Sequence, residues 1–409
     1  MKGFERRTRS RVMNGILLLP LLLLGHTANA DDRSPFLHDA RLLAEAKQRI
    51  EKADPAALAA LEKLRKSADK AMTGAAFTIV NKTKLPPSSD KHDYFSLGIY
   101  WWPNPDTPDG LPSVRHDGKV NPEVKDFDAP PKNAMTNAVY HLALAHYFTG
   151  HQPYADRAAL LLRAFFLDEA TRMNPNLNFG QGVPGHNTGR AAGIIETVGL
   201  ATKVVDAAIL LRGSEAWTAE DERGLQQWFR DYRDWLENSK IGKQEGKASN
   251  NHGMYYDVQV AVFSLYIGDN DHARAILQRV PETRIVPQIA PDGSQPEELA
   301  RTKSFTYSTF NLQAMLALAT LGKRLGVDLW AYTGPDGQSI PKALDYLLPY
   351  AVLDKPWPRE QIKTFDPDAL LRPFLRHAIL YFGEERYRAP LETLGRPPQG
   401  DLIELLYPL

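Results

Sequence analysis

Two separated segments of the chain carry residue types that can bind an anion and move a proton. The first is Ser249-Asn250-Asn251-His252-Gly253, in which two amides precede a histidine. Amide side chains can hold a carboxylate by hydrogen bonds, and histidine titrates near neutral pH. The group therefore suits a site that holds a carboxylate beside a base. An ordinary helix cap followed by a surface histidine would explain the same residues, and both interpretations stay open at this level.

The second segment, residues 297–310, contains Arg301 and Tyr307. An arginine fork can clamp a carboxylate with two parallel hydrogen bonds. A tyrosine hydroxyl can donate or accept a proton. Taken alone, the two residues are also explained as a salt-bridged arginine and a phenol at the edge of the core. Together with the Asn251-His252 pair, they would form an anion clamp with a proton-transferring group.

A segment rich in proline and aromatic residues, 77–132, could supply a binding surface for sugar rings. Long irregular segments within compact domains are usually functional or disordered, and the density of aromatic residues here argues against disorder. Packing under a proline-rich loop is the alternative interpretation. The predicted substrate-binding residues of this segment are Lys91, His92, Tyr94, Tyr100, Trp101, Trp102 and Arg115.

A polar stretch at residues 172–190 ends in a second amide- and histidine-containing group. Its candidates for the lining of a cleft are His186, Asn187 and Arg190, and Asn250 from the first segment joins them as a predicted substrate-binding residue. We expect this group to start a helix, so capping is the alternative role. The sequence has no Cys, no phosphate-binding loop, no His-Glu-x-x-His and no dinucleotide fingerprint. Neither a metal ion nor a cofactor is expected.

Helical periodicity dominates the chain after residue 35 and predicts an all-α protein. Apolar residues recur at spacings of three and four between charged ones, and glycines such as Gly150 and Gly268 mark helix ends. About ten helices with short connections predict helical hairpins arranged as a toroid, and a small bundle plus an appendage is the alternative. We expect one catalytic domain over residues 31–409. The expected helices cover residues 37–53, 56–72, 134–148, 154–166, 189–211, 220–237, 252–266, 272–278, 309–325, 341–353 and 368–381.

Charge and the N-terminal sequence predict export. Forty-nine basic residues balance 49 acidic ones, so nothing favours binding to nucleic acid or to an anionic membrane. Basic residues precede a short apolar run, Ile16–Leu24, and Ala28-Asn29-Ala30 follows. This is the plan of a signal peptide over residues 1–30, with cleavage after Ala30. We expect a periplasmic or secreted protein that is monomeric and has no membrane anchor after cleavage.

Several ordered motifs resemble the alginate lyase domain family. Beyond Asn250-Asn251-His252-Gly253 and the segment from Arg301 to Phe310, they are residues 89–94, 100–103, 108–112 and 117–123, and the likeness covers roughly residues 75–350. The resemblance implies an (α/α) toroid with a long cleft and cleavage of an anionic polysaccharide, a uronate polymer, by β-elimination. It places the catalytic roles on Asn251, His252, Arg301 and Tyr307.

One departure from the family pattern bears on the substrate. Arg301 and Tyr307 are six residues apart, whereas a step of seven is expected in the mannuronate-cleaving branch. The resemblance therefore points to a sister branch similar to enzymes acting on glucuronan as well as alginate. Two rival functions on the same toroid are a non-catalytic polyuronate binder and a glycoside hydrolase. A hydrolase needs two carboxylates about 5–9.5 Å apart, for which the candidates are Asp93, Glu196, Asp257 and Glu297.

Overall fold

The computed structural model describes residues 1, 3, 34–353 and 355–409. Apart from its residues 1 and 3, the predicted signal peptide, with its cleavage site after Ala30, lies outside the described residues. Within the described ranges, no helix is both long and apolar enough to cross a bilayer. The chain from residue 34 onward is mainly helical, as expected from the periodicity.

Most of the longer helices occur where apolar periodicity predicted them. They are α1 (Ala40–Glu51), α2 (Pro55–Ala71), α3 (Ala129–Thr149), α4 (Gln152–Leu162), α5 (Val205–Leu211), α6 (Ala219–Asn238), α8 (Asn251–Tyr266), α9 (Asn270–Val280), α12 (Ser304–Leu325), α13 (Ile340–Leu347) and α15 (Pro367–Phe382). Shorter α-helices are α7 (Lys240–Glu245), α10 (Val286–Gln288), α11 (Pro296–Leu299), α14 (Pro349–Val352), α16 (Arg388–Thr393) and α17 (Ile403–Leu406).

Tighter or wider helical turns connect several of these helices. The segments η2 (Pro122–Asp126), η4 (Ala191–Thr197) and η7 (Glu385–Tyr387) are 3-10 helices, and η3 (Arg163–Leu167), η5 (Leu200–Val204) and η6 (Pro281–Ile285) are π-helical turns. The prediction of a single helix over residues 189–211 is therefore wrong. It is divided into η4, η5 and α5, because Gly193 packs directly on the backbone of Gly180 and the segment follows that neighbour.

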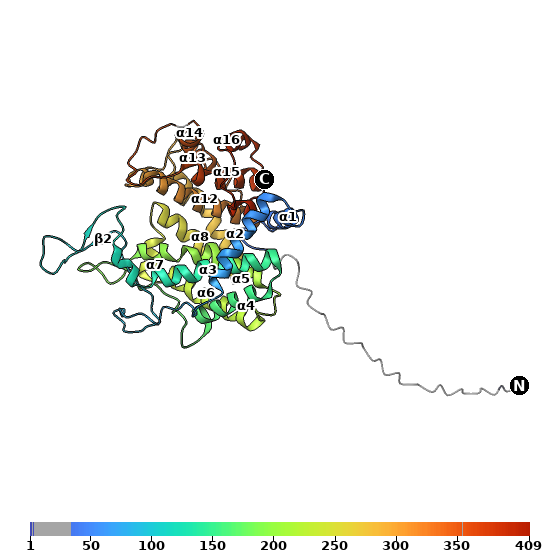
Figure 1. Ribbon diagram of the computed structural model, residues 1–409, viewed down its shortest axis with the longest axis horizontal. Helices are drawn as coiled ribbons and strands as arrows, with labels where there is room; N and C mark the ends of the chain where they lie inside the picture. The colour runs from blue at the N-terminus through green and yellow to red at the C-terminus, as the bar shows by residue number, and fades with distance from the viewer. Residues whose placement is uncertain (2, 4–33, 354) are drawn as a thin grey trace.

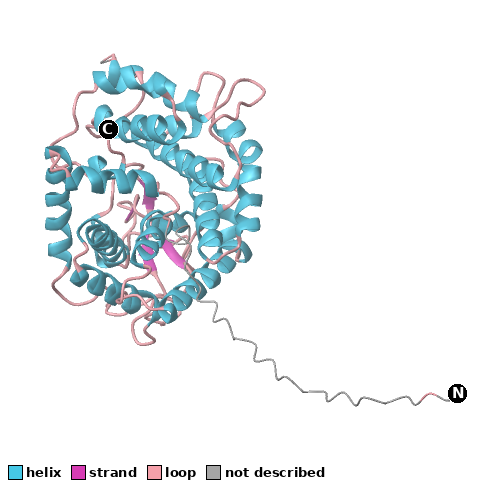
Figure 2. Ribbon diagram, turned by 90° about the vertical axis from the view of Figure 1, so that its right-hand side faces the viewer, coloured by secondary structure: helices cyan, strands magenta, loops and turns pink. Residues whose placement is uncertain are grey.

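Successive helices pack side by side into a ring, which confirms the predicted toroid of helical hairpins. Figure 2 shows helices following one another around the rim. Contacts run from α2 to α3, α3 to α4 and α5, α6 to α8, α8 to α9 and α12, and α12 to α13 and α15. The C-terminal α17 packs against α1 and α2, so the two ends of the ring meet, as the blue and red helices in Figure 1 show.

The helices nearest the core are apolar on most of their surface. In α8 only His252 of the sixteen residues is not buried, and a helix with no polar face is stable only when surrounded by other elements. The same holds for much of α12. Because these two helices pack against each other, their N-terminal ends carry the two predicted catalytic segments on a rigid support.

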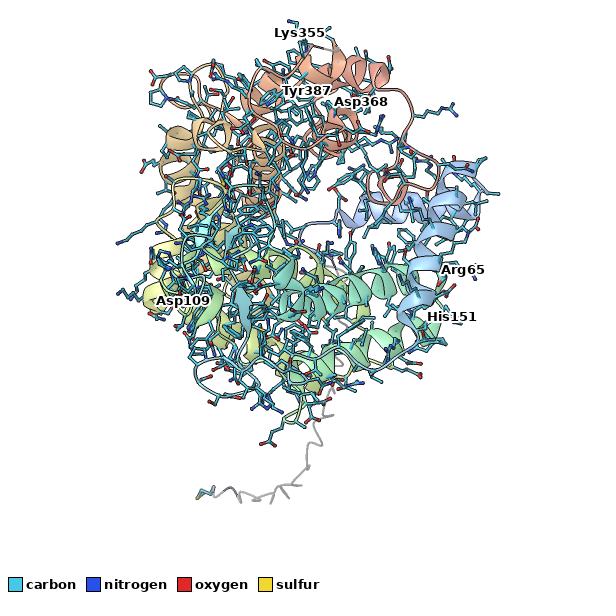
Figure 3. All side chains as sticks on the ribbon, turned by 60° about the vertical axis from the view of Figure 1, so that its left-hand side comes forward. Arg65, Asp109, His151, Lys355, Asp368 and Tyr387 are labelled. Carbon is cyan, nitrogen blue, oxygen red and sulfur yellow. The ribbon has the colours of Figure 1, made fainter. Side chains whose placement is uncertain are left out.

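The proline-rich segment forms a projecting structure with three short strands, one of which pairs with a fourth strand from residues 179–182. Strand β1 (Phe95–Leu97) pairs in parallel with β4 (Phe179–Gly182), and β2 (Trp101–Trp102) pairs antiparallel with β3 (Val114–Arg115). At two to four residues, these strands are too short for a periodicity to reveal them. The segment extends from the ring beside β2 in Figure 1, and Figure 3 places its Asp109 on the opposite side from Arg65 and His151.

Candidate active site

A cavity of about 780 Å³ brings the two predicted catalytic segments together. Its volume is in the range of about 300–1,000 Å³ that is usual for small-molecule sites. The proline-rich segment, η4, the start of α8 and the start of α12 contribute its walls. The polar and aromatic residues that line it are Tyr100, Trp101, Arg115, Lys132, Asn133, Gln181, Arg190, Glu196, Asn250, Asn251, His252, Glu297, Arg301, Tyr307 and Phe310.

Asn251 is held at the first turn of α8 by a buried carboxylate. Its backbone N–H and its side-chain Nδ2 donate to the two oxygens of Glu298, at 2.7 and 2.8 Å. Both residues are 1% exposed, and burial raises the pKa of Glu298 despite these hydrogen bonds. An amide nitrogen carries two hydrogens, so Asn251 is oriented by Glu298 with one N–H left for a ligand. The helix start expected at this place is confirmed, with Asn250 as its cap accepting from the N–H of His252.

His252 is oriented by a second buried carboxylate that the sequence did not reveal. Its Nδ1 lies 2.6 Å from Oε1 of Glu245, at the end of α7. Nδ1–H donating to Glu245 fixes the tautomer in which Nε2 is the free acceptor. Glu245 precedes His252 by seven residues across a helix end, and no motif marks that separation.

Tyr307 lies between a second tyrosine and the arginine of its own segment. Its hydroxyl is 2.7 Å from the hydroxyl of Tyr100, and Cζ of Arg301 is 3.7 Å from the centre of its ring. Burial raises the pKa of Tyr307 well above its usual value, and the hydrogen bond with Tyr100 acts in the same direction. The positive charge of Arg301 opposes this shift. In the free protein Tyr307 is therefore a neutral phenol, with a cation beside it that would stabilise the phenolate.

Arg301 is shared between the cavity and a structural ion pair. Its Nη2 and Nε donate to the two oxygens of Asp117 at 2.7 and 3.2 Å, and Thr302 donates to the same carboxylate. Burial acts to raise the pKa of Asp117, but the hydrogen bonds from Arg301 and Thr302 outweigh it and hold that pKa well below its usual range. Asp117 belongs to the proline-rich segment, so this pair also connects that segment to the turn that precedes α12.

Five of the predicted substrate-binding residues line the cavity: Tyr100, Trp101, Arg115, Arg190 and Asn250. Tyr100 contributes its hydroxyl to Tyr307 rather than an open face. Arg115 is exposed and pairs with Asp117 at 2.8 Å. Arg190 lies at the start of η4, with its guanidinium 5.9 Å from the ring centre of Trp101.

Three predicted binding residues near the start of the proline-rich segment lie elsewhere. Tyr94 is fully buried and donates to Glu196 at 2.9 Å. The prediction that Tyr94 offers a surface for sugar stacking is therefore wrong. Its hydroxyl instead holds Glu196, which lines the cavity. His92 contacts the carbonyl of Arg172 through Nδ1 at 2.6 Å. Lys91 is exposed beside it. Neither His92 nor Lys91 is among the residues that line the cavity.

Trp102, His186 and Asn187 also lie outside the cavity lining. Trp102 donates through Nε1 to the carbonyl of Lys119 at 3.0 Å, and its side chain points away because neighbouring residues of a strand face opposite sides. His186 packs its ring 5.1 Å from that of Trp101 and contacts the carbonyl of Ser113. Asn187 forms a β-bridge with Val183. The helix expected at His186 begins only at residue 191.

The carboxylates considered for a hydrolase are mostly occupied by structural contacts. Asp257 is buried in a two-pronged ion pair with Arg284, at 2.7 and 3.2 Å. Asp93 accepts from two asparagine amides. Glu196 and Glu297 line the cavity, and Glu196 accepts from Tyr94 and Ser96. Among the described residues, no group of three or more His, Asp or Glu side chains could hold a metal ion.

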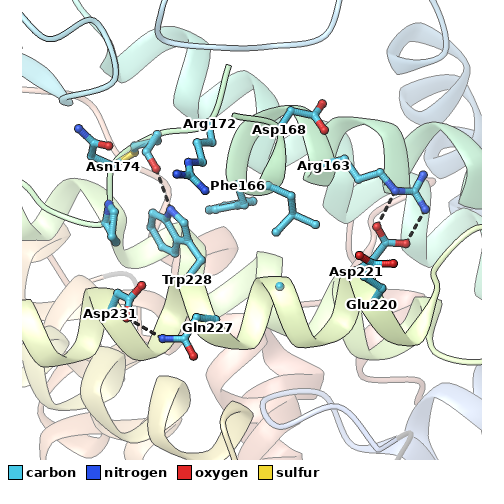
Figure 4. A pocket seen from close by; sticks show the side chains of 14 residues that line it. Arg163, Phe166, Asp168, Arg172, Asn174, Glu220, Asp221, Gln227, Trp228 and Asp231 are labelled. Atoms are coloured by element: carbon cyan, nitrogen blue, oxygen red, sulfur yellow. Dashed lines mark hydrogen bonds and ion pairs between the residues drawn. The ribbon is translucent and has the colours of Figure 1, made fainter. Parts of the chain in front are cut away.

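Another pocket, of about 460 Å³, lies between the end of α4 and α6 (Figure 4). An ion pair of Arg163 with Asp221 borders it, and Trp228 closes its floor with a hydrogen bond to the carbonyl of Met173. It contains none of the residues predicted from the sequence for catalysis or binding. The candidate active site is therefore the cavity at the starts of α8 and α12.

Comparison with known proteins assigns the family. The family model for alginate lyase matches residues 78–357, which includes the proline-rich segment and both catalytic segments. The chain belongs to the alginate lyase family. It is a polysaccharide lyase, and the hydrolase and the non-catalytic binder are set aside.

Solved structures agree with this assignment. A crystal structure of an alginate lyase from Bacteroides ovatus is 38% identical with a TM-score of 0.88, over 91% of this chain and 98% of that chain. A variant of alginate lyase A1-III complexed with a tetrasaccharide has a TM-score of 0.50 at 15% identity, over 90% of this chain and 97% of that one, which shows likeness of fold alone. A search of curated protein sequences gives no match.

Proposed function

We propose that this lyase cleaves a (1,4)-linked polyuronate by β-elimination and leaves a 4,5-unsaturated uronate at the new non-reducing end. The observation that carries the proposal is the convergence of Asn251, His252, Arg301 and Tyr307 on one cavity. Asn251 and His252 lie in the first turn of α8, Tyr307 lies in the first turn of α12, and Arg301 precedes α12 by three residues. The set supplies what elimination needs: an anion clamp, a base and an acid.

Asn251 and Arg301 would form the anion clamp, which makes the C5 proton of the uronate more acidic. A carboxylate next to C5 resists further negative charge, so its charge must be compensated before the carbanion can delocalise into it. The free N–H of Asn251 and the guanidinium of Arg301 are placed to do this. In the free protein Arg301 donates hydrogen bonds to Asp117 through Nη2 and Nε. It would offer its remaining N–H groups to the substrate carboxylate while keeping the ion pair with Asp117.

Proton transfer falls to Tyr307 and His252. Tyr307 is neutral in the free protein, since burial raises its pKa, and this suits it to protonate the departing O4. When the C5 proton and O4 lie on one face of the sugar (syn), Tyr307 would first lose its own proton to solvent. As a phenolate, stabilised by Arg301 and by the Tyr100 hydroxyl, it would then take the C5 proton and pass that proton to O4. When they lie on opposite faces (anti), His252, with Nε2 free opposite Glu245, would be the base.

For the substrate, we propose alginate rich in mannuronate, or glucuronan. The relative at 38% identity is named an alginate lyase, and the six-residue step from Arg301 to Tyr307 favours a branch that also accepts glucuronan. We further propose that the protein acts as a monomer and a single domain in the periplasm or outside the cell, because residues 1–30 have the plan of a signal peptide.

Replacement of one hydroxyl tests the reaction. Purified protein should generate the ultraviolet absorbance of an unsaturated uronate from polymannuronate, polyguluronate or glucuronan, and Tyr307→Phe should lower the rate at least about a hundredfold, the usual contribution of a proton-transfer group. Tyr147→Phe is the matched control, because Tyr147 packs on Phe148 and is not among the residues that line the cavity. A folded Tyr307→Phe protein with unchanged turnover would refute the assignment.

A further inference from the structure

One wall of the cavity carries cations that play no part in the elimination steps. Arg190, at the start of η4, and Lys132, in the first turn of α3, both line the cavity. Within the part of the chain that the structure describes, neither has a carboxylate partner within 4 Å, although Glu196 lies nearby. Other buried cations differ: Lys82 pairs with Asp128, and Arg284 with Asp257.

Arg190 has unused hydrogen-bonding capacity. Its Nη2 donates to Oε1 of Gln181 at 2.5 Å, whereas its buried Nε has no partner among the described residues. The buried indole Nε1 of Trp101 also lacks a partner there, and the Arg190 guanidinium is 5.9 Å from the ring centre of Trp101. A buried donor without an acceptor is costly. Two such donors beside one cavity indicate a ligand that supplies acceptor oxygens.

Lys132 adds a charge at the same wall. The side chain is 2% exposed, and its ammonium donates to the backbone carbonyl of Glu196 and to Oδ1 of Asn133. An ammonium group has three donors, so one is left for a further acceptor. The carboxylate of Glu196 accepts instead from Tyr94 and Ser96, and burial raises its pKa, which weakens its compensation of the lysine charge.

Strained backbone holds Arg190 in place. Gln181 has φ of +48° without being glycine and is 3% exposed, and its N–H donates to the hydroxyl of Ser96 at 2.7 Å. A non-glycine residue keeps such a conformation only where its surroundings enforce it, and these residues gather at functional sites. Here the conformation directs the amide oxygen of Gln181 to the guanidinium.

We propose that Arg190 and Lys132 form a second carboxylate subsite, which binds the uronate adjacent to the one that is cleaved, with the indole N–H of Trp101 donating to the same sugar. The proposal rests on the proposed function, since a polyuronate carries a carboxylate on every sugar. A chain held at Asn251 and Arg301 therefore presents a second carboxylate one unit away. The subsite would select for two successive uronates and discriminate against chains in which neutral sugars interrupt the uronates.

Defined oligosaccharides test the subsite. We would compare an all-uronate tetrasaccharide with analogues in which one uronate next to the cleaved unit is replaced by the corresponding neutral hexose. For wild-type protein, the analogue with the neutral sugar in this subsite should have a kcat/KM about tenfold to a hundredfold lower, the worth of a charge-assisted hydrogen bond, mainly through KM. Arg190→Gln should lose a similar factor on the all-uronate substrate and little more on the analogue.

Control variants separate the subsite from general electrostatics and from misfolding. Arg172→Gln removes the same charge from an exposed residue of the other pocket (Figure 4) and should keep wild-type kcat/KM. Arg190→Lys retains the charge and should lose less than Arg190→Gln; circular dichroism and the melting temperature verify folding of both. An equal response of wild type and Arg190→Gln to the neutral analogues would overturn the subsite. Absence of an unsaturated product with wild-type protein on every polyuronate would instead overturn the proposed function.

Discussion

At the scale of single residues, the cavity is organised by carboxylates that never need to touch a substrate. Glu298 orients Asn251, Glu245 orients His252 and Asp117 holds Arg301. Three of the four catalytic candidates thus have a carboxylate behind them, which limits their rotation and keeps their polar atoms in position, and Tyr307 is held by the Tyr100 hydroxyl instead. Pre-organised donors of this kind stabilise developing charge without having to reorient during the reaction.

Lys132 should make substrate affinity depend on pH. Burial lowers its pKa to about 8, although Glu196 opposes the shift and Lys203 adds to it. The ammonium is charged below this value and becomes neutral as the pH rises through it, so kcat/KM for an all-uronate substrate should fall above about pH 8. A Lys132→Met protein should lack this fall. Initial rates at subsaturating substrate measure kcat/KM at each pH. A wild-type kcat/KM that stays constant from pH 7 to 9 would contradict the prediction.

Unfolding does not explain such a loss of activity. An unfolded lysine keeps its proton up to about pH 10.4, so between about pH 8 and that value the unfolded chain binds more protons at this position than the folded one. Stability rises with pH wherever the unfolded state binds more protons. The cost of burying the charged Lys132 is therefore relieved as the pH rises through the same window in which binding weakens, so stability should rise while kcat/KM falls, and thermal melts at each pH distinguish the two effects.

At the scale of elements, close approaches between backbones place the cavity wall. A Cβ atom at Gly193 would lie 2.6 Å from the backbone of Gly180, and one at Gly189 would lie 2.1 Å from the carbonyl of Asn178. These contacts bring η4 against β4 and so bring Arg190 beside Gln181. Backbone atoms cannot move aside as a flexible side chain can, so the small residues are required here.

Gly193→Ala should therefore destabilise the protein by about 1–3 kcal/mol, the usual cost of overpacking, and should also lower substrate affinity. The matched control is Gly224→Ala in α6, where the nearest atom is the end of the Leu167 side chain at 3.0 Å. That side chain can shift, and alanine is favoured over glycine within a helix by about 1 kcal/mol, so the control should be neutral or stabilising. Urea unfolding curves measure both; equal midpoints for the two variants would contradict this explanation.

At the scale of the whole molecule, the ring is closed by contacts between the two ends of the chain. The N-terminal segment is also held by the middle of the chain, where Asp206 on α5 accepts from the backbone N–H groups of Phe36, Leu37 and His38 at 2.6–3.1 Å. Glu404 on α17 binds Arg376 of α15 at 2.8 Å, with both side chains 7% exposed, and lies 3.5 Å from Arg49 of α1. One buried carboxylate therefore connects three helices from opposite ends of the sequence.

Glu404→Ala should lower the free energy of unfolding by about 3–5 kcal/mol, because it leaves the Arg376 charge buried without its partner. The cavity is formed by other elements, so turnover by the protein that remains folded should be close to wild type. Chemical denaturation followed by tryptophan fluorescence gives the stability, and a parallel assay gives turnover. A loss below about 1 kcal/mol, as for an exposed pair, would show that the ring does not depend on this contact.

The sequence by itself determined the features that depend on local order. The helical period predicted the long helices and the toroid, the Asn250 cap predicted the start of α8, and the ordered motifs led to the family. It did not determine where α12 begins, because Ser304 and Phe305 are held there by hydrogen bonds to Glu360 and Gln361, more than fifty residues away. Contacts of this kind leave no trace in periodicity.

Only the tertiary structure decided which residues of the predicted set share a cavity. It buried Tyr94, turned Trp102 away, and brought Glu245, Glu298 and Asp117 behind the catalytic candidates. It also brought Lys132 to the wall that holds Arg190. The physical reason is that burial and hydrogen bonding depend on neighbours across the ring. Residue types and spacing show what chemistry a side chain could perform, and packing selects which of them face the substrate.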